Sequence, residues 1–285
     1  MLASLILFCA IAFDETPVLL QQIELDQNGF SCNTIDGVAG GKTDRAIQLA
    51  SGKNLKAYEP FRVEAVTQAD IDALVKIPPS PAEKAKLPRM GYETIKEMFA
   101  ERGHMSQRAL ERLNPGVDWE HIQPGLKLVI PDFPSIENDL AAGTRKRKSA
   151  ELIKVSLSRF EITAYDANGA CIALFPCSIA RDKNKLPPQG ELKITSYIPN
   201  PNYTYSPDFV PAGKKAAKYV FPEGPNCPVG VAWMGLNLPG YGIHGTPRPE
   251  SIGNAESHGC FRLANWNAAR LFAMCQSGTR VIIEQ

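Results

Sequence analysis

The sequence predicts a multidomain α+β protein: a small all-α module, an α/β middle module and a mostly-β, β-sandwich-like domain, in that order along the chain. Three observations predict it. Helical stretches fill the first part, a proline-rich joint (KIPPSPAEKAKLP) precedes two further helices and a strand, and alternation of apolar and polar residues begins near residue 151. A chain of 285 residues can hold several such units and their cores.

The composition is that of an ordinary globular protein, with 44% hydrophobic and 21% charged residues. The formal net charge is +1. A charge this small gives no reason to expect a nucleic-acid partner.

Residues 1–12 are expected to be a signal peptide. The apolar run from Met1 to Phe13 is shorter than the roughly 20 residues that span a bilayer. Ala10-Ile11-Ala12 has the small-x-small form of a cleavage site, although no Lys or Arg precedes the run. The alternative is a buried N-terminal strand. Cleavage predicts export to the periplasm or cell wall, with no transmembrane segment in the mature chain.

The cysteines do not predict a disulfide framework. Removal of Cys9 with the signal peptide leaves six of the seven cysteines, and their spacing fixes no pairing. Cys275 follows Ala268, Leu271 and Phe272 at helical spacing, which predicts a core position for its side chain.

Residues 13–60 are expected to form a helical module. Two turn-rich pairs, Asp36-Gly37 and Gly40-Gly41, precede a helix that Thr43 is expected to cap. The stretch resembles the three-helix peptidoglycan-binding module of cell-wall enzymes. The matching residues are Leu20-Gln21, Gly29-Phe30, Ile35-Asp36-Gly37 and Gly40-x-x-Thr43 leading into Ala46. The alternative is a helical hairpin that only packs on its neighbours.

A connector at 61–89 leads into a second module at 90–133. In the connector, Ser80, Pro81 and Glu83 predict the capped start of a helix. In the module we expect a helix ending at Gly103, a helix over 106–113 and a strand over 126–130. This order, with Asn-Pro and then Gln-Pro-Gly-x-x-Leu-x-Ile-Pro, resembles a LysM module, which implies binding of N-acetylglucosamine glycans. The Gly-Asp-Thr loop of that family is absent, and His104, between the helices, is expected to cap or pack.

A basic linker at 134–150, which includes Arg145 to Lys148, is expected to be a solvated hinge before a domain at 151–285. Strands are expected over 153–157, 160–163, 192–198, 229–234 and 279–284, with a hairpin turn at Asn168-Gly169. A helix from Trp266 to Gln276 is expected to be capped by Asn265 and closed by Gly278.

The stretch GIHGTPRPESIGNAESHGCF carries the chemistry of this domain. His244, His258 and Cys260 suit Zn²⁺, but a fourth ligand would have to come from Glu256 or Cys227 without a familiar spacing. A buried inert thiol is a second possibility. The polar neighbours of Cys260 and the helix expected to start at Asn265 instead favour a lowered thiol pKa and a nucleophile.

The geometry of a nucleophilic site remains open at this point. Gly259 leaves room for a substrate carbonyl, and the main-chain N–H groups near Gly259 and Cys260 suit an oxyanion. Either His258 or His244 could be the base.

His244-Gly-Thr and, beginning thirteen positions after His244, Ser257-His-Gly-Cys-Phe-Arg-Leu together resemble the active-site signature of the L,D-transpeptidases (YkuD-type catalytic domain). The match extends through NPNYTYSPDF, GPNCPVGVAWMGLNLPGYGIHGT and GTRVII. The resemblance implies that Cys260 is the nucleophile and that His244 accepts and donates the proton. It also implies that the Gly245 carbonyl orients His244. Supporting roles are implied for Ser257, His258 and Gly259, and binding of a substrate carboxylate for Arg262. Phe261 stands where the family has Ile or Val, which is expected to narrow the site.

The implied activity is peptidoglycan transpeptidation that forms 3→3 cross-links through a cysteine acyl-enzyme, without metal or cofactor. Stem peptides and glycan strands are the implied partners. The alternatives are an L,D-carboxypeptidase, attachment of a protein to peptidoglycan by the same acyl-enzyme, and a non-catalytic wall-binding protein.

Overall fold

The computed structural model describes residues 16–143, 149–206, 218–257 and 259–285. The expected signal peptide, the basic run Arg145–Lys148 and His258 lie outside these residues. No helix in the described part of the chain is long and apolar enough to cross a membrane.

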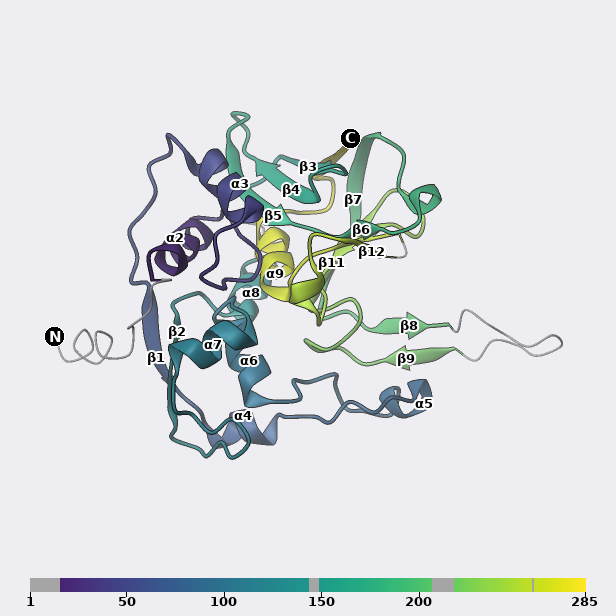
Figure 1. The fold of residues 1–285 in the computed structure, drawn as a ribbon. Helices are drawn as coiled ribbons and strands as arrows, with labels where there is room; N and C mark the ends of the chain where they lie inside the picture. The colour runs from purple at the N-terminus through teal and green to yellow at the C-terminus, as the bar shows by residue number, and fades with distance from the viewer. Residues whose placement is uncertain (1–15, 144–148, 207–217, 258) are drawn as a thin grey trace.

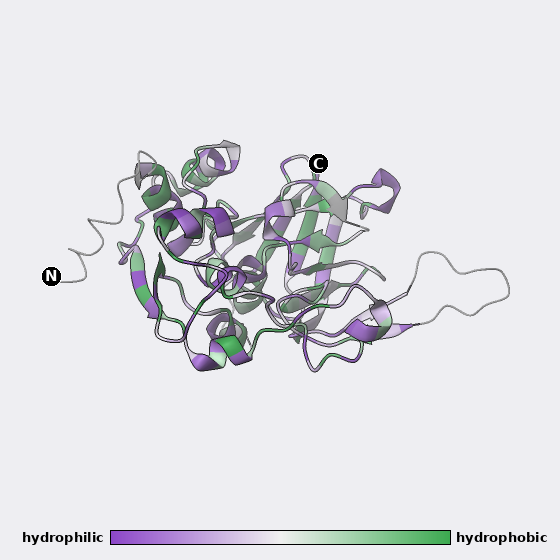
Figure 2. Cartoon of the chain, turned by 60° about the horizontal axis from the view of Figure 1, so that its bottom comes forward, coloured by the Kyte–Doolittle hydropathy of each residue, from purple (hydrophilic) through white to green (hydrophobic). Residues whose placement is uncertain are grey.

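The C-terminal region is built on one eight-stranded sheet (Figure 1). Apolar residues are concentrated on its strands (Figure 2). Its order, from edge to edge, is β13 (Phe261–Arg262), β11 (Gly242–His244), β10 (Ala232–Leu236), β7 (Gly190–Pro199), β14 (Arg280–Glu284), β3 (Leu152–Ser156), β4 (Glu161–Tyr165) and β5 (Cys171–Pro176). The predicted alternation is confirmed at Ile153 and Val155, which are buried, while Lys154 is not.

The long strand β7 explains why the sheet curls. Residues 190–193 pair with β14, whereas residues 194–199 pair with β10. A strand that serves two neighbours along different halves of its length turns the sheet, as corner strands of sandwiches do. The expected sandwich is therefore a single curled sheet. Two small sheets join it: β6 (Ile179–Ala180) with β12 (Ala255–Ser257), and β8 (Tyr203–Tyr205) with β9 (Tyr219–Phe221).

Helix α9 (Asn265–Met274) lies at the centre of the molecule, against β10 and β11 (Figure 1). Ala264 is its N-cap, without a side-chain cap, so the cap predicted at Asn265 is wrong. Helix α8 (Ile136–Gly143) packs on α9 and buries Leu140, within the stretch expected to be a linker. Cys275 is buried in the same core, as predicted, and the six cysteines that the structure describes form no disulfide with one another.

The N-terminal region is a second packed body. Its elements are α2 (Thr16–Gln27), α3 (Gly41–Ala50), β1 (Phe61–Ala65), α4 (Gln68–Asp72), α5 (Pro81–Lys84), α6 (Ile95–Arg102), α7 (Gln107–Leu113) and β2 (Lys127–Pro131). The helices expected to end at Gly103 and to start at Ser106 are present, and β2 lies one residue later than predicted. Strand β1, which pairs antiparallel with β2, was not expected in the connector.

Two predicted caps differ from the structure. Gly40, not Thr43, precedes α3, and the buried Thr43 hydroxyl accepts a hydrogen bond from Gln22 instead. Ser80 precedes α5 but makes no side-chain cap. His104 has the predicted packing role, since its ring stacks on Phe133 and Trp266 with centroid distances of 3.9 and 5.2 Å.

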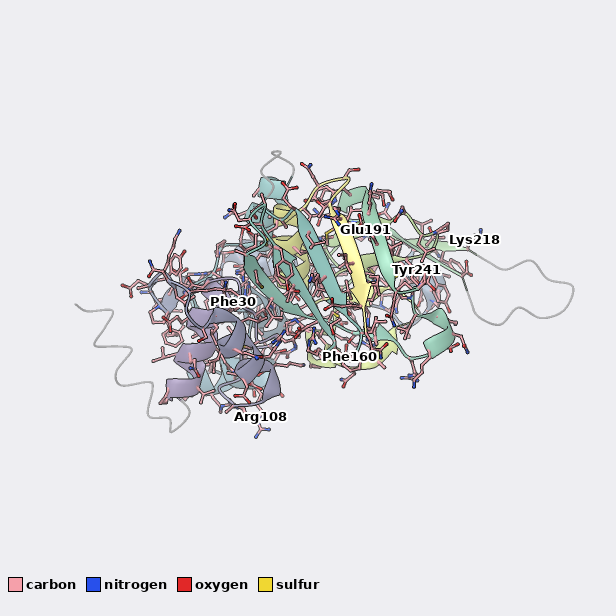
Figure 3. The ribbon with its side chains drawn as sticks, turned by 90° about the horizontal axis from the view of Figure 1, so that it is seen from above. Phe30, Arg108, Phe160, Glu191, Lys218 and Tyr241 are labelled. Carbon is pink, nitrogen blue, oxygen red and sulfur yellow. The ribbon has the colours of Figure 1, made fainter. Side chains whose placement is uncertain are left out.

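The expected modules pack together and onto the sheet. Ile23 and Ile35 of the first module share one hydrophobic cluster with Phe99 and Leu110 of the second. Phe30 forms a β-bridge with Leu174 at the β5 edge, beside the N-terminal helices (Figure 3). The N-terminal region therefore covers one side of the domain that carries the GIHGTPRPESIGNAESHGCF motif.

Candidate active site

Two short parallel strands bring His244 and Cys260 to one place. Strands β11 and β13 pair so that Ile243 faces Phe261 and His244 faces Arg262. Cys260 directly precedes β13, so this register places it level with Gly242, two residues before His244 and on the same face of the pair. The side chains of both residues line one cleft of about 890 Å³.

His244 is held in one orientation and is uncharged. The residue is only 6% exposed, and its Nδ1 lies 2.7 Å from the carbonyl oxygen of Gly245. Because a carbonyl can only accept, Nδ1 carries the proton and Nε2 keeps its lone pair. Burial, opposed by the Gly245 hydrogen bond and assisted by the charge of Arg262, lowers the pKa of His244 to about 4. Trp233 stacks on the ring at a centroid distance of 5.5 Å.

Cys260 is partly buried beside the turn that precedes β11. Its Sγ donates a weak hydrogen bond to the Gly240 carbonyl at 3.5 Å. Burial raises the pKa of the thiol, and a main-chain hydrogen bond at Gly242 opposes the rise only in part. The lowered thiol pKa expected from the sequence is therefore wrong: loss of hydration outweighs the polar neighbours of Cys260. The structure combines a thiol with a neutral imidazole.

The other predicted site residues fall into three groups. Gly259 and Arg262 are buried and line the cleft. The main chain of Ser257 ends β12, but its side chain, like His258, lies outside the described residues. Phe261 is fully buried in the core of the sheet and does not line the cleft, so the narrowing expected from it is absent.

Sequence reasoning missed the second wall of the cleft, which the N-terminal region supplies. Glu93, Thr94 and Glu97 at the start of α6 line the cleft, with Lys84 of α5. Asn226 holds this wall to the domain: its amide donates to the Gly91 carbonyl at 2.9 Å and to Glu97 Oε1 at 2.8 Å. These residues lie far from the motif in sequence, and no local pattern marks them.

The two walls differ in charge. Arg248 and Arg262 make the wall of the sheet domain basic, whereas Glu93 and Glu97 outnumber Lys84 on the wall of the N-terminal region. Among the described residues, neither glutamate forms an ion pair with Lys or Arg. Burial raises the pKa of Glu97, and hydrogen bonds from the main chain of Glu93 and Thr94 and from the Asn226 amide counteract the rise only in part. A ligand with both an ammonium and a carboxylate group would match this distribution of charge.

No group of three or more His, Cys, Asp or Glu residues suited to a metal ion occurs in the described part of the chain. Two of the ligands considered for a metal site, His258 and the Glu256 side chain, lie outside the described residues.

Comparison with known proteins identifies the family of the second half of the chain. The family model of the YkuD L,D-transpeptidase catalytic domain matches residues 150–283. A putative L,D-transpeptidase YkuD of Bacillus licheniformis is 28% identical over 191 residues, which cover 67% of this chain and 93% of that protein. A putative L,D-transpeptidase YqjB of Bacillus subtilis is 36% identical over 112 residues, which cover 37% of this chain and 57% of that protein.

Among solved structures, L,D-transpeptidase 3 from Mycobacterium tuberculosis aligns with a TM-score of 0.38 and 17% identity, over 48% of this chain and 60% of that one. The family match covers the curled sheet, α9 and the whole cleft face that holds His244, Cys260 and Arg262. Residues 150–283 are therefore an L,D-transpeptidase catalytic domain, of a family of cysteine-dependent acyltransferases.

Proposed function

We propose that this protein is a peptidoglycan L,D-transpeptidase that forms 3→3 cross-links through an acyl-enzyme on Cys260. The observation that carries the proposal is the shared cleft of Cys260 and a neutral His244 whose Nδ1–H is fixed on the Gly245 carbonyl. That arrangement leaves Nε2 as a proton acceptor in the same cleft as the thiol, and a thiol with such a base is the pairing that nucleophilic acyl transfer needs.

In the first step, Cys260 attacks the carbonyl of the third residue in a tetrapeptide stem. The Sγ proton passes to His244 Nε2 as the S–C bond forms, because the thiol is not ionised beforehand. Main-chain N–H groups near Gly259 and Cys260 would stabilise the oxyanion. The C–N bond then breaks, and the terminal D-Ala leaves with the proton from His244.

In the second step, the side-chain amine of another stem attacks the thioester. His244 takes the proton from the amine and returns it to Sγ as the S–C bond breaks, so the enzyme is restored. The new amide replaces the one that was broken, so the sequence of steps needs no nucleotide. The difference in charge between the cleft walls supports a stem peptide as ligand, because its diamino residue carries both an amine and a carboxylate.

The remaining expectations belong to the same proposal. Export to the periplasm or cell wall would bring the enzyme to peptidoglycan. The N-terminal region, which resembles wall-binding modules in sequence, would raise the local concentration of substrate by holding the enzyme on glycan strands.

The test is to incubate the purified protein with disaccharide-tetrapeptide and to analyse the products by mass spectrometry. We expect a dimer with the mass of two monomers minus one alanine, with fragmentation placing the bond between two third residues. Cys260→Ala should abolish it, whereas Cys171→Ala should not, because Cys171 lies at the far edge strand β5 and does not line the cleft.

The other outcomes identify the alternatives. Tripeptide without dimer would show that water is the acceptor, as in an L,D-carboxypeptidase. Transfer only to a lysine-containing protein would show protein attachment. Absence of acyl-enzyme and product in a folded protein that binds peptidoglycan would leave the non-catalytic wall-binding function.

A further inference from the structure

Glu101 is a buried carboxyl group that the proposed chemistry does not use. It lies on α6, outside the matched family domain, and the residue is 6% exposed. Its Oε1 accepts two hydrogen bonds of 3.0 Å, one from the Tyr92 hydroxyl and one from the Asn265 amide. Burial raises the pKa of Glu101 to about 8, so the group is uncharged at neutral pH. The hydrogen bond from Asn265 to Glu101 is therefore a buried polar contact between the catalytic domain and the N-terminal region.

Asn265 connects Glu101 to the cleft. It is fully buried, and its Nδ2 also donates to the Pro225 carbonyl at 3.0 Å, so the orientation of the amide is set by two acceptors. The other end of the amide, Oδ1, lies directly against Gly230 and Gly245. A Cβ at either glycine would overlap with Oδ1, so the absence of side chains there makes room for the Asn265 amide.

Gly245 is the residue whose carbonyl accepts the Nδ1–H of His244 at 2.7 Å. Its own N–H donates to the Ala232 carbonyl at 3.2 Å, on the sheet side. The Asn265 amide packs on Gly245 at a Cβ-free position, so movement of that amide would move the Gly245 peptide. A shift of this peptide would change the direction of the hydrogen bond that fixes the imidazole.

We propose that Glu101 is a positioning residue for His244, which acts by holding the Asn265 amide against the Gly245 peptide. The inference rests on the proposed catalytic role of His244. It makes the N-terminal region part of the active-site support, beyond any role of that region in binding the cell wall.

The test compares three variants of the full chain. Glu101→Leu removes the acceptor, Glu101→Gln keeps an acceptor at Oε1, and Tyr92→Phe removes the other hydrogen bond to Glu101 without touching Asn265. We expect Glu101→Leu to lower kcat for acylation at least about tenfold with little change in KM, since small misplacements of catalytic groups are costly. Glu101→Gln should restore most of the rate, and Tyr92→Phe should lower stability but leave kcat near that of the wild type.

A second readout does not depend on turnover. The ¹⁵N shifts of the His244 ring should report the Nδ1–H form in the wild type and in Glu101→Gln. In Glu101→Leu they should move towards a mixture of both tautomers. Asn265→Ala should have the same effect, and the double variant Glu101→Leu/Asn265→Ala should be no worse than either single one, because both act through one contact.

The failures of the two hypotheses are distinguishable. A wild type that forms no acyl-enzyme would overturn the proposed function, and the ring shifts would still test the link from Glu101 to His244. If Glu101→Leu changes the free energy of unfolding but neither kcat nor the His244 ring shifts, the contact is only structural and the inference is wrong. Should Glu101→Leu fail to fold, Asn265→Ala with unchanged ring shifts would have the same meaning.

Discussion

Burial favours the uncharged form of both His244 and Cys260 in the cleft. It lowers the pKa of His244 and raises that of Cys260, so each stays uncharged at neutral pH. A preformed thiolate–imidazolium pair is therefore not the resting state of this site. In the proposed mechanism, the proton would therefore move only when the substrate carbonyl begins to take up negative charge, which main-chain N–H groups would stabilise.

The acid limb of the pH profile follows from His244. A histidine whose folded pKa is about 4 remains a proton acceptor well below the ordinary value of about 6.5. We expect the rate of Cys260 acylation, measured in single turnovers by mass spectrometry, to persist at pH 5 and to fall as the pH drops through about 4. Circular dichroism at each pH is the control for unfolding. An acid limb near 6.5 in a folded protein would contradict the predicted burial effect.

At the scale of elements, buried polar side chains fix the contact between helix α3 and strand β4 of the sheet. Strand β4 has apolar residues on one face, but the other face, which includes Glu161, is buried as well. Arg45 of α3 reaches Glu161 at 2.8 Å, and Arg159 reaches it at the same distance. Burial alone would raise the pKa of Glu161, but the two arginines lower it.

Replacing Arg45 tests this helix–sheet contact. Arg45→Met keeps the length of the side chain but leaves Glu161 with Arg159 alone, so we expect a loss of about 2 kcal/mol in the free energy of unfolding at pH 7. Because the Glu161 pKa is lowered, the loss should shrink as the pH falls below the ordinary carboxylate range. Denaturant titrations at pH 7 and pH 3 measure both effects. The exposed Arg108 on α7 provides the matched control, Arg108→Met, and an equal effect at both positions would contradict the prediction.

Over the whole molecule, the sequence predicts what depends on local pattern and misses what depends on distant contacts. Alternation predicts β3, and the Ser106 and Gly103 signals place α6 and α7. Strands β11 and β13 have three and two residues, too few for a period to be seen, although they set the relation of His244 to Cys260.

The candidate site divides in the same way. The motif predicts His244, Cys260 and Arg262, and the contact of His244 with Gly245 is present as the resemblance implies. Glu97 and Glu101 carry no chemical motif, because their meaning comes from α6 docking onto the catalytic domain. The raised pKa of Cys260 could not be predicted either, since burial depends on the assembled cleft.

The buried carboxylate of Asp26 joins the two halves of the chain, and we expect this contact to determine how they unfold. Its fully buried carboxylate lies 2.7 Å from Arg270 of α9 and 3.2 Å from His104 Nδ1. Burial would raise the pKa of Asp26, but the charges and hydrogen bonds of Arg270 and His104 lower it to about 2. The stabilisation is therefore complete above the unfolded value near 4 and is lost as the pH falls through about 2, a contribution of about 2 kcal/mol.

We expect the full chain to unfold in one cooperative calorimetric transition at pH 7, because α2 and α9 are tied through this buried charge and Glu101 adds a second buried link. Asp26→Asn leaves Arg270 without its counter-charge and should lower the free energy of unfolding by about 3 kcal/mol. Asp72→Asn, at an exposed position on α4, should change it by less than about 0.5 kcal/mol. Two separate transitions in the wild type would show that the N-terminal region folds independently of the catalytic domain. Equal effects of the two substitutions would show that the Asp26–Arg270 pair does not stabilise the contact between them.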